Sequence, residues 1–160
     1  MREPEAARLL RHDLRSEDCP ALRVELAFSS VDPAVVLDRV REVLAATAAG
    51  DNSPAWPPRA EWAAERLPRW FVEAVRFSDE QIATSTWLWS LDAWLGTMAS
   101  RGWEYWTESG TSHTGLIVLW AHSDPFAMEP LVFLLRLLGA VDIRFKDERL
   151  GDDWRAWEWR

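Results

Sequence analysis

One pattern occurs twice in this chain and limits the folds that it can adopt. Residues 27–36 read AFSSVDPAVV and residues 120–128 read WAHSDPFAM, so each runs from an apolar segment through serine to an Asp-Pro pair. Aspartate is a favoured N-cap residue, and proline suits the first turn of a helix because an amide hydrogen would have no partner there. The pattern predicts two strand-to-helix transitions, capped by Asp32 and Asp124.

Hydrophobic spacing around the first transition predicts one strand and one helix. Residues 22–30 alternate between apolar and other side chains, as a strand with one buried face does. Residues 33–49 carry an apolar stripe at helical spacing, and Gly50 is placed to end that helix.

Spacing around the second transition predicts a hairpin, a helix and a last strand. Residues 103–108 alternate, whereas residues 116–121 are uniformly apolar, as in a strand that is covered on both faces. A helix is expected to begin at the Asp124 cap and to end at Gly139. A strand over residues 141–146 follows it.

The order of these elements predicts an α+β domain of the ferredoxin-like βαββαβ type. We expect this domain over residues 20–160, an amphipathic helix inside residues 1–19, and a helical, tryptophan-rich insertion at about residues 51–101. A three-stranded sheet with helices on one side is the alternative.

The insertion is the part of the chain where the pattern leaves choices open. Residues 69–77, RWFVEAVRF, could form a helix or a strand that changes the order of the sheet. The last helix of the insertion could begin at Ser78, where Gln81 would complete a capping box, or at Ser90.

Charge and cysteine content narrow the classes of partner and compartment. With 18 basic and 26 acidic side chains, the formal net charge is −8, which argues against binding to nucleic acid or to an anionic membrane and favours a basic or neutral partner. Cys19 is the only cysteine, which excludes an intramolecular disulfide and favours a reducing, cytoplasmic location. We expect neither a signal peptide nor a membrane span, because the longest apolar run is short and contains Arg136.

The sequence lacks the motifs of common catalytic and cofactor sites. There is no GxSxG, HExxH, CxxC or GxGxxG spacing in it. His122 lies two residues before Asp124 and could form a catalytic pair with it, but the first copy of the repeated pattern needs no histidine at this place. We therefore interpret Asp124 as a helix cap and expect no catalytic residue, no metal and no organic cofactor.

Twelve tryptophans set this composition apart. Spacing assigns Trp87, Trp94, Trp103 and Trp120 to the core. Five of the other tryptophans, together with two glutamates expected on one face of the same strand, are our candidates for ligand or partner binding: Trp89, Trp106, Trp154, Trp157, Trp159, Glu104 and Glu108. The three terminal tryptophans are expected to pack on this chain or on another copy, because an exposed aromatic tail would lower solubility.

Three classes of function fit these observations, of which an enzyme without a recognisable motif is the least favoured. The first is a non-catalytic, acidic interaction protein, such as an inhibitor or immunity-type factor, that covers a basic protein partner. The second is a small-molecule-binding domain with an aromatic-lined pocket. A homodimer is also expected, because the apolar residues of segment 125–140 cover most of the circumference of a helix and one sheet cannot bury them all.

Overall fold

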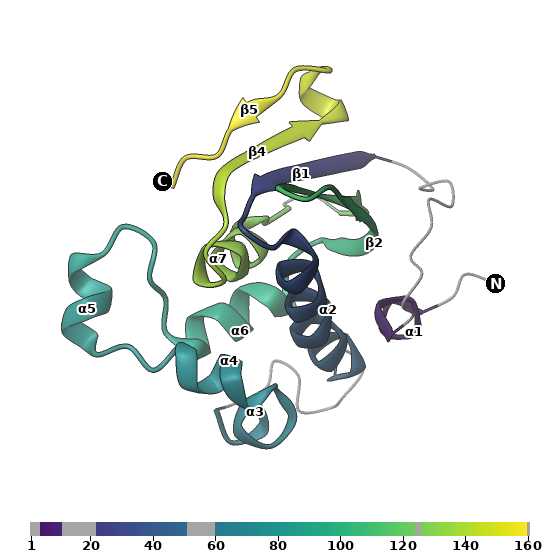
Figure 1. Cartoon of the computed structure of the whole chain (residues 1–160). Helices are drawn as coiled ribbons and strands as arrows, with labels where there is room; N and C mark the ends of the chain where they lie inside the picture. Colours follow the sequence, from purple (N-terminus) through teal and green to yellow (C-terminus); the bar gives the residue numbers. More distant parts are fainter. Residues whose placement is uncertain (1–3, 11–21, 51–59, 124–125, 160) are drawn as a thin grey trace.

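A computed structural model of the protein describes residues 4–10, 22–50, 60–123 and 126–159 (Figure 1). It confirms an α+β architecture with a five-stranded sheet in the order β2-β3-β1-β4-β5, in which every neighbouring pair is antiparallel. The strands are β1 Arg23–Ser29, β2 Trp103–Gly110, β3 Thr114–Ala121, β4 Val141–Asp147 and β5 Arg155–Ala156. The three-stranded alternative is therefore wrong.

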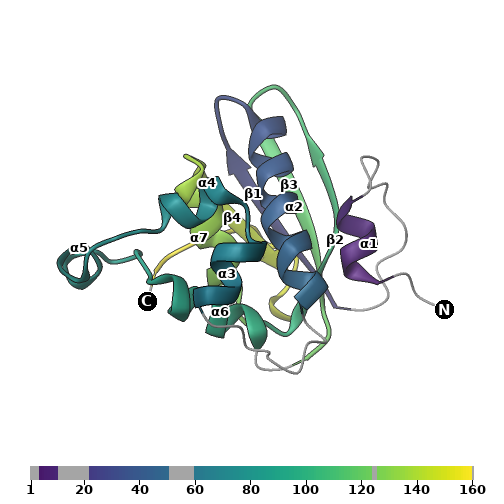
Figure 2. The ribbon, with the colours of Figure 1, turned by 90° about the horizontal axis from the view of Figure 1, so that it is seen from below.

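Helices cover one face of this sheet. They are α1 Glu5–Leu10, α2 Pro33–Gly50, α3 Ala60–Arg66, α4 Arg69–Ala74, α5 Asp79–Thr84, α6 Leu91–Ala99 and α7 Glu129–Leu137, followed by the short 3-10 turn η1 Glu148–Leu150. Figure 2 shows α2 and α7 against the sheet, with α6 beside α7 and α1 next to β2. Within the described ranges, no helix lies over the opposite face (Figures 1 and 2).

The insertion between α2 and β2 is helical in its described part, residues 60–101. Residues 69–74 form α4, so the possibility of a strand here is wrong. Both proposed start signals are used. Ser78 and Gln81 form a capping box at α5, and the Ser90 hydroxyl accepts a hydrogen bond from the Ala93 amide at the start of α6.

The two strand-to-helix transitions differ from each other. Asp32 caps α2 as expected, because its carboxylate accepts a hydrogen bond from the Val35 amide at 3.3 Å. The second helix begins at Glu129 and not at residue 124, with Met128 as its N-cap and Pro130 in its first turn. The preceding segment cannot be helical because Ala127 bonds to the backbone of residue 101. Asp124 and Pro125 lie outside the described residues.

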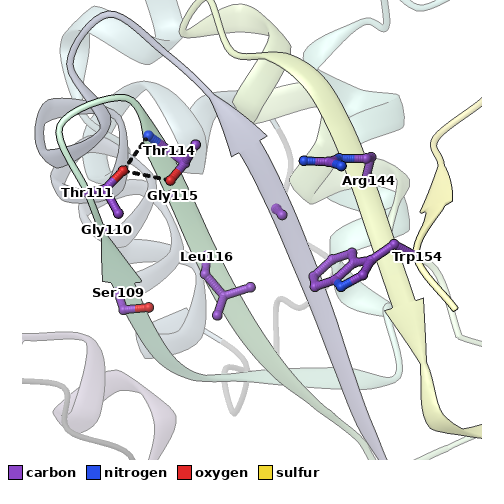
Figure 3. Close-up of a pocket in the computed structure, with 9 residues that line it drawn as sticks. Ser109, Gly110, Thr111, Thr114, Gly115, Leu116, Arg144 and Trp154 are labelled. Atoms are coloured by element: carbon purple, nitrogen blue, oxygen red, sulfur yellow. Dashed lines mark hydrogen bonds between the residues drawn. The ribbon is translucent and has the colours of Figure 1, made fainter. Parts of the chain in front are cut away.

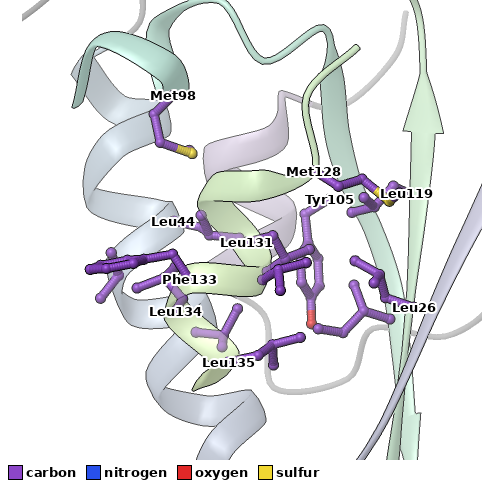
Figure 4. Packing of buried hydrophobic residues seen from close by; sticks show 14 of the residues in the cluster. Leu26, Leu44, Met98, Tyr105, Leu119, Met128, Leu131, Phe133, Leu134 and Leu135 are labelled. Atoms are coloured by element: carbon purple, nitrogen blue, oxygen red, sulfur yellow. The ribbon is translucent and has the colours of Figure 1, made fainter. Parts of the chain in front are cut away.

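The core is centred on α7. Residues 131–135 of this helix are all fully buried. Figure 4 shows Leu131, Phe133, Leu134 and Leu135 among side chains from the strands, α2 and α6. The insertion covers the side of α7 that the sheet does not reach: Trp87 and Trp89 pack on Phe133, and the Trp94 indole donates a hydrogen bond to the Pro130 carbonyl. The apolar surface that favoured a homodimer is thus covered within the chain, and the homodimer itself stays a prediction.

Two glycines give opposite predictions for the same substitution. An added Cβ at Gly115 would overlap the buried Phe28 ring, so Gly115→Ala should destabilise the protein by about 1–3 kcal/mol. Gly96 is exposed inside α6 with open space around it, and Gly96→Ala should stabilise by about 0.5–1 kcal/mol. Urea unfolding of both variants measures the difference. Equal shifts would contradict the close packing of Phe28 on β3.

The two serine caps should also differ in effect. Ser90→Ala should lower the global free energy of unfolding by about 1 kcal/mol, because α6 buries Trp94, Leu95 and Met98. Ser78→Ala should leave the global value unchanged, because α5 buries no residue and can open locally. Urea unfolding reports the global values, and amide hydrogen exchange in α5 reports the local opening. A global loss with Ser78→Ala would contradict this description of α5.

Candidate functional site

The seven candidate residues from the sequence lie in three separate places. Trp89, Trp157 and Trp159 belong to an aromatic cluster beside α7. Glu104, Trp106 and Glu108 lie along β2. Trp154 precedes β5 and lies over the open face of the sheet (Figure 3). The structure therefore does not assemble the seven into one site.

The terminal tryptophans have a structural role in the fold. Trp159 contacts Trp89 at 6.2 Å between ring centres, and Trp157 contacts both Trp159 at 5.8 Å and Phe145 at 6.0 Å. Trp89 in turn stacks on Phe133 of α7. The expectation that the tail packs on this chain is confirmed for Trp157 and Trp159.

A bulge in β2 separates the two glutamates that were expected on one face. Tyr105 pairs with Leu119, but the next pair joins Thr107 to Val118, so Trp106 is an extra residue in the strand. After this bulge the alternation of side chains reverses. Glu104 consequently points to the open face and Glu108 to the helix-covered face, which corrects the prediction of a shared surface.

Residues of β2 at the bulge hold α1 against the edge of the sheet through contacts with Arg8. The Arg8 guanidinium forms an ion pair with Glu104 at 2.9 Å, donates to the Tyr105 carbonyl at 3.1 Å and lies 4.4 Å from the centre of the Trp106 ring. Trp106 contacts Trp120 at 6.3 Å between ring centres. Trp120 thus lies on the open face, and its predicted place in the core is wrong.

A second ion pair fixes the other end of this contact. The Glu5 carboxylate accepts a hydrogen bond from the Tyr105 amide at 2.7 Å and pairs with Arg101 at 2.5 Å. Burial raises the pKa of Glu5 above its ordinary value, although Arg101 and the Tyr105 amide act in the opposite direction. Glu5 and Arg8 together satisfy both backbone groups of Tyr105, so they block the edge of β2 to another strand.

Glu108 belongs to a network between β2 and α2. The Tyr105 hydroxyl donates to its carboxylate at 2.7 Å, and Arg41 pairs with it at 2.6 Å while also contacting Asp38. Burial raises the pKa of Glu108, and the hydrogen bond from Tyr105 and the charge of Arg41 offset part of that effect. Tyr105 is fully buried, so a substrate cannot reach its hydroxyl. This network fixes α2 to the sheet.

The open face carries a hollow of about 440 Å³, which we call the sheet hollow (Figure 3). Register places Leu116 of β3, Ala27 of β1 and Arg144 of β4 in one row across three strands. Ala27 forms a low floor because its side chain is a single methyl group. Leu116 and the Trp154 indole form the sides, Thr111 lies at the end near the hairpin turn, and Ser109 of β2 lies beside Leu116, with which it pairs.

Two properties make the sheet hollow the best candidate for a binding site. Trp154 lines the hollow with 42% of its surface exposed, so a ligand in the hollow can contact its indole. Arg144 is exposed, and its guanidinium has no ion pair or hydrogen bond with any described residue. An indole beside a free guanidinium can bind a molecule that combines a flat apolar part with an acceptor group.

The charges beside the sheet hollow are already paired. Glu25 bonds to Lys146 at 3.1 Å and to Arg23 at 2.7 Å. Its burial would raise its pKa, but the hydrogen bonds from Lys146 and Arg23 bring the pKa below its ordinary value. Lys146 also lies 5.4 Å from the centre of the Trp154 ring. No Asp or Glu is among the described residues that line the hollow.

The sequence pointed to Trp154 and missed its partners. Arg144 alternates with apolar residues in β4, as any solvent-facing residue of a strand would. Only the register of β4 and β3 on β1 brings Arg144, Ala27 and Leu116 into one row, and that register depends on long-range pairing.

Comparison with family models, with curated proteins and with solved structures finds no match to this chain. Within the described ranges, no helix has the length and apolar content that crossing a bilayer requires. In that same part of the chain, no three His, Cys, Asp or Glu side chains gather in a way that could hold a metal ion.

Two carboxylates predict opposite effects of pH on stability. The Glu108 pKa is raised, so the wild type loses stability as the pH increases from the ordinary glutamate pKa to the raised one, and Glu108→Gln removes that loss. Asp147 bonds to Arg149, which lowers its pKa despite partial burial, so its contribution is present at neutral pH and is lost as the pH falls through the lowered pKa.

The measurement is urea unfolding of the two variants and the wild type at about pH 7 and about pH 3. The free energy of unfolding of Glu108→Gln minus that of the wild type should be higher at pH 7 than at pH 3. The corresponding difference for Asp147→Asn should be lower at pH 7 than at pH 3. Shifts of the same sign in both variants would contradict the assignment.

Proposed function

We propose that this protein is a non-catalytic binding module that takes a small ligand in the sheet hollow. The observation that carries this proposal is the exposed indole of Trp154 beside the unpaired guanidinium of Arg144. The volume of about 440 Å³ falls within the range of small-molecule sites. The second function inferred from the sequence, a domain with an aromatic-lined pocket, is thus the one that the geometry favours.

The arrangement of elements supports a ferredoxin-like topology beneath this site. The first four strands of the chain have the order β2-β3-β1-β4 in the sheet, with α2 between β1 and β2 and α7 between β3 and β4 along the chain. This is the connectivity of two split βαβ units that share one antiparallel sheet. On this proposal, β5 and the helical insertion are additions to the basic fold, and β5 brings Trp154 over the open face.

Capture of a basic protein is supported only by the net charge. The sheet hollow has no carboxylate lining in the described structure and presents a guanidinium, so at this surface a basic partner would meet repulsion. The carboxylates on β2 that could have attracted a cation, Glu104 and Glu108, are paired with Arg8 and Arg41. A role as an inhibitor or immunity-type factor would need another surface.

On β2 and just after β3, the described side chains that could perform catalysis are already engaged in contacts. Glu104 and Glu108 form ion pairs, and the Tyr105 hydroxyl is buried. His122 is exposed and packs against Trp120 at 5.1 Å between ring centres. These contacts support binding without chemistry.

A fragment screen by NMR tests the proposal. Isotope-labelled protein is titrated with a library of neutral, cationic and anionic fragments, and chemical shifts are followed in the hairpin and at residues 144 and 154. We expect fragments that shift amides of the sheet hollow, and we expect Trp154→Ala to abolish these shifts. Leu10→Ala is the matched control, because it removes an exposed apolar side chain on α1. A library without any fragment that perturbs the hollow would overturn the proposal.

A further inference from the structure

We infer that the ligand of the sheet hollow is a small aromatic monocarboxylate, an inference that rests on the proposed function. Three features of the hollow define this chemistry: the free guanidinium of Arg144, the apolar trough between Trp154 and Leu116, and the balance of charge around them. Each feature restricts the ligand in a different way.

Arg144 requires an acceptor, and a planar anion suits it best. Its guanidinium has no partner in the described part of the chain, and Figure 3 shows the side chain extending over the sheet from β4. A guanidinium offers parallel N–H donors in one plane, which match the two oxygens of a carboxylate. A neutral ligand would leave this cation unpaired under the bound molecule, at a cost in desolvation.

The trough beside Arg144 selects a flat apolar body. Leu116 and Trp154 lie on opposite sides of Ala27, whose small side chain leaves room above β1. A planar ring can lie on the floor and contact the indole, whose large apolar face favours stacking. A branched aliphatic group would fill this shape less well because the trough is bounded by one flat wall.

The hairpin adds hydroxyl groups at one end of the trough. Thr111 and Thr114 bond to each other through their hydroxyl oxygens at 2.7 Å, and the Thr111 oxygen also accepts from the Thr114 amide at 3.0 Å. Ser109 is exposed, and its hydroxyl has no partner among the described residues. A polar substituent on the ring could bond to Ser109.

Arg144 is the cation of the hollow that no described carboxylate engages. Lys146 and Arg23, beside the hollow, share one carboxylate, that of Glu25. Arg144 alone would neutralise a monocarboxylate one to one but a doubly charged phosphate only by half, and the net charge of −8 on the protein would repel the excess. A monocarboxylate is therefore the anion that suits Arg144 best.

The test compares three probes that share one ring system: 2-naphthoate, 2-naphthamide and 2-naphthylmethylammonium. Each is titrated into the full-length protein, and Kd is taken from amide shifts at the sheet hollow. We expect the carboxylate to bind about tenfold or more tightly than the amide, since hydrogen bonds between charged groups are stronger than neutral ones. The cation should bind more weakly than the amide.

Variants locate the charge effect. Arg144→Gln should weaken naphthoate by about tenfold and leave naphthamide nearly unchanged, whereas Arg144→Lys should give an intermediate value because it keeps the charge without the planar fork. Arg76→Gln is the matched control: it removes one exposed positive charge from the insertion and should leave naphthoate binding as it is. Trp154→Phe should weaken all three probes together.

The outcomes separate this inference from the proposed function. If the amide or the cation binds the hollow as tightly as the carboxylate, or if Arg144→Gln binds naphthoate like the wild type, the inference is wrong and the binding function stands. If a protein or peptide carboxylate binds through Arg144 while naphthoate does not, the small-molecule class is wrong. If no probe and no library fragment perturbs the hollow, both fail.

Discussion

Complete enclosure of α7 is the constraint on which the rest of this structure depends. Five consecutive side chains of this helix, residues 131–135, are fully buried, and consecutive positions point in all directions around a helix. A sheet can cover only one side. The helical insertion and the tryptophans around Phe133 supply the cover on the other side, so the insertion is part of the core and not an appendage.

Because α7 and the elements that enclose it lie on one side of the sheet, the opposite face of the sheet is available for a ligand. The helices and most of the aromatic side chains are committed to the core, and the terminal segment returns over the sheet only as the short strand β5. This return brings Trp154 to the open face, while Trp157 packs on Phe145 of β4 and Trp159 packs on Trp89 of the insertion. One tail thus contributes both to the core and to the candidate site.

Sequence reasoning was most successful where the structure is local. Alternation identified β1 and β2, a uniformly apolar run identified β3, and helical spacing identified α2. Ser78 and Ser90, which were alternative starts for one helix, are the caps of two separate helices, α5 and α6. It failed where distant segments decide. The bulge at Trp106 lies beside α1, whose charged side chains bind the Tyr105 backbone, and the segment before α7 is bonded to residue 101 through Ala127. The row of Arg144, Ala27 and Leu116 required the register of three strands, which no local pattern contains.

The projecting helix α5 has a consequence for how this chain can change in length. In both Figure 1 and Figure 2, α5 stands away from the rest of the molecule, and none of its residues is buried. The chain leaves the core after Phe77 and returns to it at Trp87, both of which pack on the core. Because the entropy of closing a loop grows only slowly with its length, residues 78–86 are a place where evolution or an engineer can add or remove a whole segment at little energetic cost.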